Sequence, residues 1–324
     1  MAPTDAGGRH RASGLAFACA SALAFGGSGP FARPLIDAGV DPLHVTWLRV
    51  TGAALVLLPV AVRHRRVLRT HPWLLLAYGV FPMAGVQAFY FASISRIPVG
   101  VALLIEFLGP VLVLGWIRIV RRHPVSRAAT LGVILAVAGL ACLVEVWAGV
   151  RLDALGLALA LGAAACQAGY FLLGDAAGDE VDPLAVISYG ALIATVLITV
   201  IAAPWNLPWH LLAGEVEIAG ATTSALVSLV WLVVVSTAVA YALGVVAIRR
   251  LSPAVAGAVA YLEVVTAIVL AWLMLGEALS VPQMIGAAIV VAGAFIAQTS
   301  VPGTAAVPSP SPVPDTEPSA HPGP

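Results

Sequence analysis

The chain has 324 residues, of which 60% are hydrophobic and only 10% are charged, and its mean hydropathy is +1.00. Soluble domains carry about 25% charged residues, so this chain cannot cover a soluble globule with polar surface, and a lipid bilayer is its natural solvent. The formal net charge of zero argues against a nucleic-acid partner.

Ten apolar runs are long enough to cross the hydrocarbon core as helices, which takes about 20 residues each. They are too long and too continuous for the strands of a membrane barrel. In chain order the predicted spans are 13–32, 43–62, 73–93, 98–118, 127–146, 154–174, 184–203, 225–247, 253–274 and 281–299. The first run resembles a signal peptide, but it has a counterpart later in the chain, so we expect it to be retained.

Arginine placement predicts the orientation, because cytoplasmic loops carry an excess of basic residues. In a model with ten spans, one side receives Arg9, Arg11, Arg63, Arg65, Arg66, Arg69, Arg118, Arg121, Arg122, Arg127, Arg249 and Arg250. The opposite side receives only Arg33, Arg96 and Arg151. We therefore expect both termini to be cytoplasmic.

The tetrapeptide VDPL occurs at 40–43 and again at 181–184, each time between two apolar runs. Continuing the alignment of the two halves places Arg96 against Arg250, and the glycine pair Gly132 and Gly139 against Gly286 and Gly293. The second half carries extra loop residues around 205–221. The repeat predicts two units, 12–148 and 152–300, followed by a proline-rich tail at 301–324 that is typical of disorder.

Each unit contains five spans, and because five is odd, the second unit enters the membrane upside down relative to the first. Inverted repeats are typical of secondary transporters, in which two symmetry-related shapes alternate access to a central site. The alternative is chance similarity between helices rich in Ala, Val, Leu and Gly. The predicted fold is therefore an all-α integral membrane protein with ten transmembrane helices in two inverted five-helix repeats.

Several motifs resemble the EamA type of the drug/metabolite transporter superfamily. They are TWLR at 46–49, IEFLGPVLVL at 105–114 and the block around GEALSVPQMIG within 250–295, and the resemblance covers residues 12–299. IEFLGP and the stretch 152–178 are similar to the threonine and homoserine exporter branch. The resemblance implies export of small metabolites, often amino acids, through a cavity between the repeats. The family usually has Glu-Pro in span 9, where this chain has Glu263-Val264, and this departure predicts a less kinked helix.

Three charged residues lie deep in predicted spans, where a charge costs roughly 3 kcal/mol or more and usually marks function. They are Glu106 in span 4, Glu263 in span 9 and Arg49 in span 2. A buried carboxyl can take up a proton on one side and release it on the other, or it can hold a substrate amine. The alternatives are a static ion pair with Arg49, a neutral carboxyl bonded to a neighbouring helix and, for Arg49, a structural anchor.

Six further polar side chains occur where apolar residues would be less costly. They are Gln87, Tyr90, Gln167, Tyr170, Tyr241 and Tyr261. The first two pairs have i, i+3 spacing, which places both side chains of a pair on one helix face. Such residues are candidates for a substrate cavity, and hydrogen bonds between helices are the alternative.

Span 1 contains FGGSGPFARP at 25–34, whose glycines and prolines disfavour a continuous helix. Interrupted helices often form binding sites in transporters. The alternative is that this stretch ends span 1 and forms its outer turn.

The chain has no G-x-x-x-x-G-K-[ST] phosphate loop and no lysine, so we expect no nucleotide cofactor and no metal, and a gradient must drive transport. H-E-x-x-H and G-x-S-x-G are also missing, which argues against the rival of a membrane-embedded enzyme. A channel, a scramblase and a non-transporting membrane protein stay as alternatives. The prediction is a secondary transporter in a bacterial inner membrane, exporting a small metabolite such as an amino acid in exchange for protons. Whether it forms a homodimer is left open.

Overall fold

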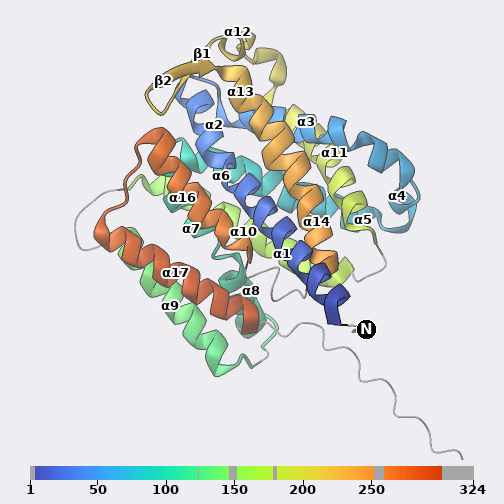
Figure 1. Cartoon of the computed structure of the whole chain (residues 1–324), viewed down its shortest axis with the longest axis vertical. Helices are drawn as coiled ribbons and strands as arrows, with labels where there is room; N and C mark the ends of the chain where they lie inside the picture. Colours follow the sequence, from blue (N-terminus) through green and yellow to red (C-terminus); the bar gives the residue numbers. More distant parts are fainter. Residues whose placement is uncertain (1–3, 123, 146–151, 178–180, 252–258, 301–324) are drawn as a thin grey trace, which may run out of the picture.

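The computed structural model describes residues 4–122, 124–145, 152–177, 181–251 and 259–300, and these are overwhelmingly helical (Figure 1). The predicted tail at 301–324 lies outside this part of the chain. Apolar helical segments overlap each of the ten predicted spans. In the first half the elements are α1 (Thr4–Gly26), α2 (Ser28–Asp37), α3 (Pro42–Arg63), α4 (Val67–Thr70), α5 (Pro72–Tyr78), the π-helix η1 (Gly79–Gly85), α6 (Val86–Ile94), α7 (Val99–Glu106), α8 (Gly109–Ile119) and α9 (Arg127–Leu143).

The second half contains the same kinds of segment and a small hairpin. Its elements are α10 (Ala154–Ala177), α11 (Pro183–Ala202), the short 3₁₀ helix η2 (Pro204–Asn206), α12 (Trp209–Leu212), β1 (Glu215–Ile218), β2 (Ala221–Ser224), α13 (Ala225–Val230), the π-helix η3 (Trp231–Val239), α14 (Ala240–Arg250), α16 (Leu262–Leu275) and α17 (Val281–Ser300).

The hairpin departs from the prediction of an all-α chain. The strands β1 and β2 pair antiparallel around a turn at Ala219 and Gly220, which both have positive φ, as a tight two-residue hairpin requires. The Ala219 N–H donates to the Met274 carbonyl at 2.8 Å, which fixes the turn against α16. The extra loop predicted around 205–221 is thus an ordered cap over one end of the helices.

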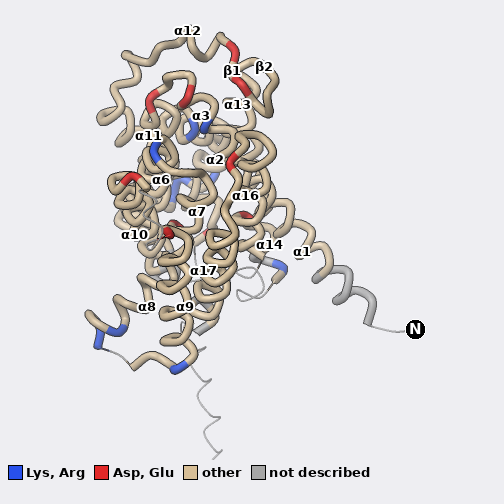
Figure 2. The backbone as a smooth tube through the Cα atoms, turned by 90° about the vertical axis from the view of Figure 1, so that its left-hand side faces the viewer, with Lys and Arg blue, Asp and Glu red and all other residues tan. Residues whose placement is uncertain are grey.

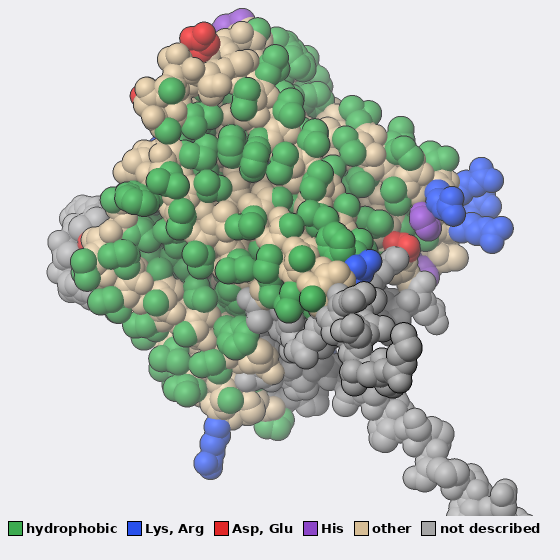
Figure 3. Space-filling model, viewed as in Figure 1, with side chains coloured by type: hydrophobic (Ala, Val, Ile, Leu, Met, Phe, Trp, Pro, Cys, Tyr) green, Lys and Arg blue, Asp and Glu red, His purple; other side chains and the backbone are tan. Residues whose placement is uncertain are grey.

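The outer surface of the helices is apolar over a wide area (Figure 3). Within α11, for example, Val196 and Val200 are 68% and 75% exposed. Six helical segments in the described residues are long and apolar enough to cross a membrane, and four shorter apolar helices accompany them. An exposed apolar surface of this extent needs a lipid environment, so the chain is a multi-pass membrane protein.

The helices of the two halves interlock. Helix α1 packs against α14 and α16, while α10 packs against α6, α7 and α8. Helix α3 packs against α11, and α9 runs alongside α17 (Figure 1). The principal contacts of one half are therefore the counterparts of those of the other.

Glycines allow α9 and α17 to approach so closely that their backbones touch. A Cβ on Gly139 would lie 2.6 Å from the backbone nitrogen of Val290, and one on Gly286 would lie 2.6 Å from that of Leu143. No side chain fits at these distances. The evenly spaced glycines singled out in the sequence thus form the contact between these two helices.

Several spans contain a turn of one or two residues but continue as a helix beyond it. Span 1 breaks at Gly27 and resumes as α2, which extends to Asp37, so FGGSGPFARP lies within the span and does not end it. Span 4 turns at Phe107 and Leu108, between α7 and α8. Tyr261 is a turn residue with helical backbone angles immediately before α16, and residues 252–258 lie outside the described chain, so the less kinked helix expected at Glu263 stays a prediction.

Candidate functional site

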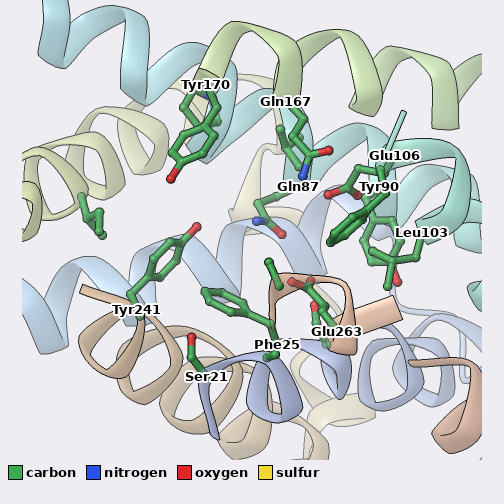
Figure 4. Close-up of a pocket in the computed structure, with 18 of the residues that line it drawn as sticks. Ser21, Phe25, Gln87, Tyr90, Leu103, Glu106, Gln167, Tyr170, Tyr241 and Glu263 are labelled. Atoms are coloured by element: carbon green, nitrogen blue, oxygen red, sulfur yellow. The ribbon is translucent and has the colours of Figure 1, made fainter. Parts of the chain in front are cut away.

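A cavity of about 530 Å³ lies between the helices of the two halves (Figure 4). All nine residues that the sequence singled out line it, although they come from six different spans. They are Arg49, Gln87, Tyr90, Glu106, Gln167, Tyr170, Tyr241, Tyr261 and Glu263. The structure therefore brings together every candidate residue, while their roles stay predictions.

Arg49 is almost fully buried, with 3% of its surface exposed, and its hydrogen-bond partners among the described residues are neutral. Its Nε donates to the Thr237 hydroxyl at 2.9 Å and its Nη2 to the Ser236 carbonyl at 3.0 Å. Its Nη1 donates to the Ser28 hydroxyl at 2.5 Å and to the Gln87 amide oxygen at 2.7 Å. One guanidinium thus connects α3 to α2, α6 and η3.

The π-helix η3 supplies two of these acceptors. Thr237 donates its hydroxyl to the Leu232 carbonyl at 2.7 Å, within the wide turn. Ser236 donates its hydroxyl to the Ala24 carbonyl at 2.7 Å, which ties η3 to α1. Such bulges are frequent at functional sites, because they redirect backbone groups away from the helix ladder.

Glu106 is the last residue of α7, and Glu263 is the second residue of α16. Both face the cavity, and neither carboxyl group has a hydrogen bond or an ion pair to any residue that the structure describes. The static ion pair with Arg49, considered from the sequence, is therefore not formed. Glu106 is buried and Glu263 is partly exposed, and two carboxyl groups without partners among the described residues make this cavity a candidate site for a proton or a cation.

Aromatic and amide side chains complete the wall. The Phe25 and Tyr241 rings meet edge to face with centroids 4.8 Å apart, and those of Tyr78 and Tyr170 lie 5.7 Å apart. The amide oxygen of Gln167 is buried without a hydrogen-bond partner among the described residues. The cavity therefore combines an apolar lining with a few polar groups, as ligand sites do.

Span 1 also contributes lining residues: Ser21, which the sequence did not single out, and Phe25 and Ser28, which belong to the FGGSGPFARP stretch that it did. Serine is common in membrane helices, so its presence alone carried no signal. The glycines beside them did carry one. A Cβ on Gly26 would lie 2.8 Å from the Glu263 carbonyl oxygen, so the glycine lets α1 approach the backbone that carries Glu263.

Among the described residues, the lining of the cavity extends toward one end of the helices. It reaches Pro183, the first residue of α11, and Ala247, near the end of α14. In the opposite direction lie Leu35, Ile94 and Val99, which are fully buried.

A polar cluster joins four segments at this closed end, and we call it the Arg33–Glu277 latch. The Glu277 carboxylate accepts from the Val99 N–H at 2.8 Å, while its other oxygen lies 3.4 Å from Arg33 Nη1. Arg33 also donates to the Ile94 carbonyl at 2.9 Å and to Asp37 at 2.8 Å. Burial raises the pKa of the Glu277 carboxyl, against the opposing effects of the Val99 N–H and Arg33.

Fold and cavity define a helical membrane protein with an internal cavity between its two halves. The model of the EamA-like transporter family matches the chain twice, over residues 12–145 and 154–299. The chain is 33% identical over 224 residues to the threonine/homoserine exporter RhtA of Escherichia coli K12, covering 68% of this chain and 69% of the exporter. It is 23% identical to the uncharacterized transporter YwfM of Bacillus subtilis, over 84% of this chain and 89% of that protein.

A solved structure, entitled only as the crystal structure of a protein, superposes with a TM-score of 0.59 at 20% identity, covering 89% of this chain and 97% of that chain. At this identity the likeness concerns the fold alone. Together with the double family match, it leads to a plain conclusion: this chain belongs to the EamA-like transporter family and is a membrane transporter.

Proposed function

We propose that the chain is a secondary transporter that exports a small amino compound, such as an amino acid, across a bacterial inner membrane in exchange for protons. The observation that carries this proposal is that two carboxyl groups, Glu106 and Glu263, face one cavity without a partner among the described residues. The similarity to exporters of threonine and homoserine makes these two amino acids the first candidates.

Two inverted five-helix repeats, 12–148 and 152–300, would provide the architecture for alternating access. The reciprocal helix contacts support this division, since α1 lies against segments of the second half as α10 lies against those of the first. The π-helices η1 and η3 occupy matching places in the two halves. From ten spans and from the arginines, several of which lie at the ends of α8, α9 and α14 (Figure 2), we infer that both termini lie in the cytoplasm.

In this orientation the described conformation is open toward the cytoplasm. The cavity reaches Pro183 and Ala247 at cytoplasmic helix ends, and the Arg33–Glu277 latch closes the opposite end. Opening the outer end requires the latch to break, because it holds α2, α6, α7 and the connection after α16 together. Closing one end while opening the other is what alternating access demands.

Competition for the same carboxyl groups would couple substrate and proton. A carboxylate that binds a substrate ammonium cannot also be protonated, and a protonated carboxyl has no charge to attract the ammonium. Loading of one species therefore displaces the other. Exchange follows if the protein reorients only when one of them is bound.

The test is exchange of labelled L-threonine across liposomes that contain the purified protein. With unlabelled L-threonine trapped inside, we expect the label to accumulate transiently, as a carrier requires. A channel would only equilibrate the label, and a non-transporting protein would give the signal of empty liposomes. Either result contradicts the proposal, and L-homoserine in place of trapped threonine tests the substrate class.

A further inference from the structure

We propose that Gln87, oriented by Arg49, binds the carboxylate of the transported amino acid. This inference rests on the proposed function and adds to it. Glu106 and Glu263 account for a substrate amine, but an amino acid also carries an anionic end. Its binding site must offer N–H or O–H donors, because carboxylates accept hydrogen bonds.

The hydrogen bond between Arg49 and Gln87 determines which end of the amide faces the cavity. A guanidinium can only donate, so the group 2.7 Å from Arg49 Nη1 must be the amide oxygen of Gln87. The amide nitrogen then points away from Arg49, with two N–H donors. The amide nitrogen has no hydrogen-bond partner among the described residues. It is also not one of the polar atoms of these residues that are fully buried and lack a partner.

The positive charge behind Gln87 is not neutralised by contact. The four acceptors around Arg49 are two hydroxyls, a backbone carbonyl and the Gln87 amide oxygen, and they occupy four of its five N–H groups. No carboxylate in the described residues forms an ion pair with Arg49. An anion held by the Gln87 amide would therefore lie close to an unneutralised buried cation, a favourable position at low dielectric.

The two ends of a zwitterion then find complementary groups in one space. Figure 4 shows Gln87, Glu106 and Glu263 extending into the same cavity from three different helices. The carboxylate of the substrate would lie at Gln87 and its ammonium at the glutamates. A simple amine would interact only with the glutamates, because it has no carboxylate for Gln87 to bind. The Gln87 amide would therefore select amino acids over amines.

The sharpest test is Gln87→Glu, which keeps the shape of the side chain and an oxygen acceptor for Arg49 but replaces both N–H donors with a charged oxygen. Binding of L-threonine and of L-threoninol, which lacks the carboxylate, is measured by the ligand-induced rise in melting temperature of the purified protein. We expect the wild type to bind L-threonine at least about tenfold more tightly than L-threoninol. We expect Gln87→Glu to reverse this preference, since the new carboxylate would repel the acid.

Gln167→Glu is the matched control, because it adds the same charge to the same cavity without contacting Arg49. If it changes the preference as much as Gln87→Glu does, or if Gln87→Glu weakens both ligands equally, the assignment of Gln87 is overturned. Equal binding of the two ligands by the wild type overturns it as well. If the wild type binds neither compound, it is the proposed substrate class that fails, and the assignment fails with it.

Discussion

Glu106 and Glu263 lie beside two short turns at matching places in the two halves of the chain. Glu106 directly precedes the turn at Phe107, and Glu263 follows the turn at Tyr261 by two residues. In the alignment that pairs Arg96 with Arg250, Phe107 falls against Tyr261. Glu106 thus precedes its turn, and Glu263 follows the equivalent turn of the other half. Both carboxyl groups reach the same cavity, although the two residues do not align in sequence.

Replacing Arg49 by lysine should weaken the protein. An ammonium cannot reach acceptors on three segments from one planar group, so the bonds to Thr237 and Ser236 would be lost. We expect the free energy of unfolding to fall by roughly 2–3 kcal/mol, with a matching drop in melting temperature in detergent. Arg96→Lys is the control, because this exposed pair with Asp153 should contribute under about 1 kcal/mol. Equal effects of the two changes would contradict a central role for Arg49.

Gly139→Leu or Gly286→Leu should separate α9 from α17. The new side chain would meet backbone atoms rather than flexible side chains, so the helices themselves must move. A loss of at least about 2 kcal/mol is expected in thermal unfolding. Gly115→Ala is the control, because nothing lies within 4 Å of a Cβ at that helical position, and this change should be neutral or stabilising. A neutral Gly139→Leu would show that this contact is unimportant.

Glu277→Gln should loosen the Arg33–Glu277 latch and favour the outward-open state. The change removes the charge that pairs with Arg33 and weakens the acceptor for the Val99 N–H. We expect Leu103→Cys, in a variant whose native cysteines are replaced by serine, to react several-fold faster with an impermeant maleimide added outside. Asp37→Asn is the control, because Asp37 contacts Arg33 but not Val99. Unchanged labelling in Glu277→Gln would exclude the latch as the outer gate.

The same labelling should depend on external pH. Burial raises the pKa of Glu277 above its ordinary value of 4.5, so the carboxylate and its ion pair are intact above the raised pKa and are lost as the pH falls through it. The labelling rate of the wild type, divided by that of Glu277→Gln at the same pH, should therefore rise on acidification, beginning at a higher pH than an ordinary glutamate would give. The division is needed because maleimide reacts with the thiolate, so the rate in Glu277→Gln should change with pH only as the thiolate fraction of the introduced cysteine does. A ratio that stays constant over this pH window would contradict this account.

The sequence was informative where a polar residue stands out from an apolar background. Arg49, Glu106 and Gln87 were found in this way, because each is costly inside a membrane unless it is used. It was silent about Ser236 and Thr237, since small hydroxyl residues are ordinary in membrane helices. The π-helices η1 and η3 have no clear sequence signature either, although Pro82 lies inside η1. Such bulges depend on packing against other spans, which one helix does not encode alone.

The Arg33–Glu277 latch could not be predicted from the sequence for a different reason. GEALS was noted as a family motif, and Arg33 only as an arginine on the outer side, so nothing connected them. Their contact depends on how the connection after α16 folds back over α2 and α7. That arrangement is a property of the tertiary structure and could not be predicted from helix periodicity.

Proton flux measured with the purified protein tests the central claim most directly. The protein is placed in liposomes loaded with a pH-sensitive dye, a proton gradient is imposed, and L-threonine or L-homoserine is added. We predict a substrate-dependent proton flux that disappears in Glu106→Gln and is strongly reduced in Glu263→Gln, while Gly115→Ala behaves as the wild type. Threonine exchange without any proton movement, or an undiminished flux in both glutamine variants, would contradict the account.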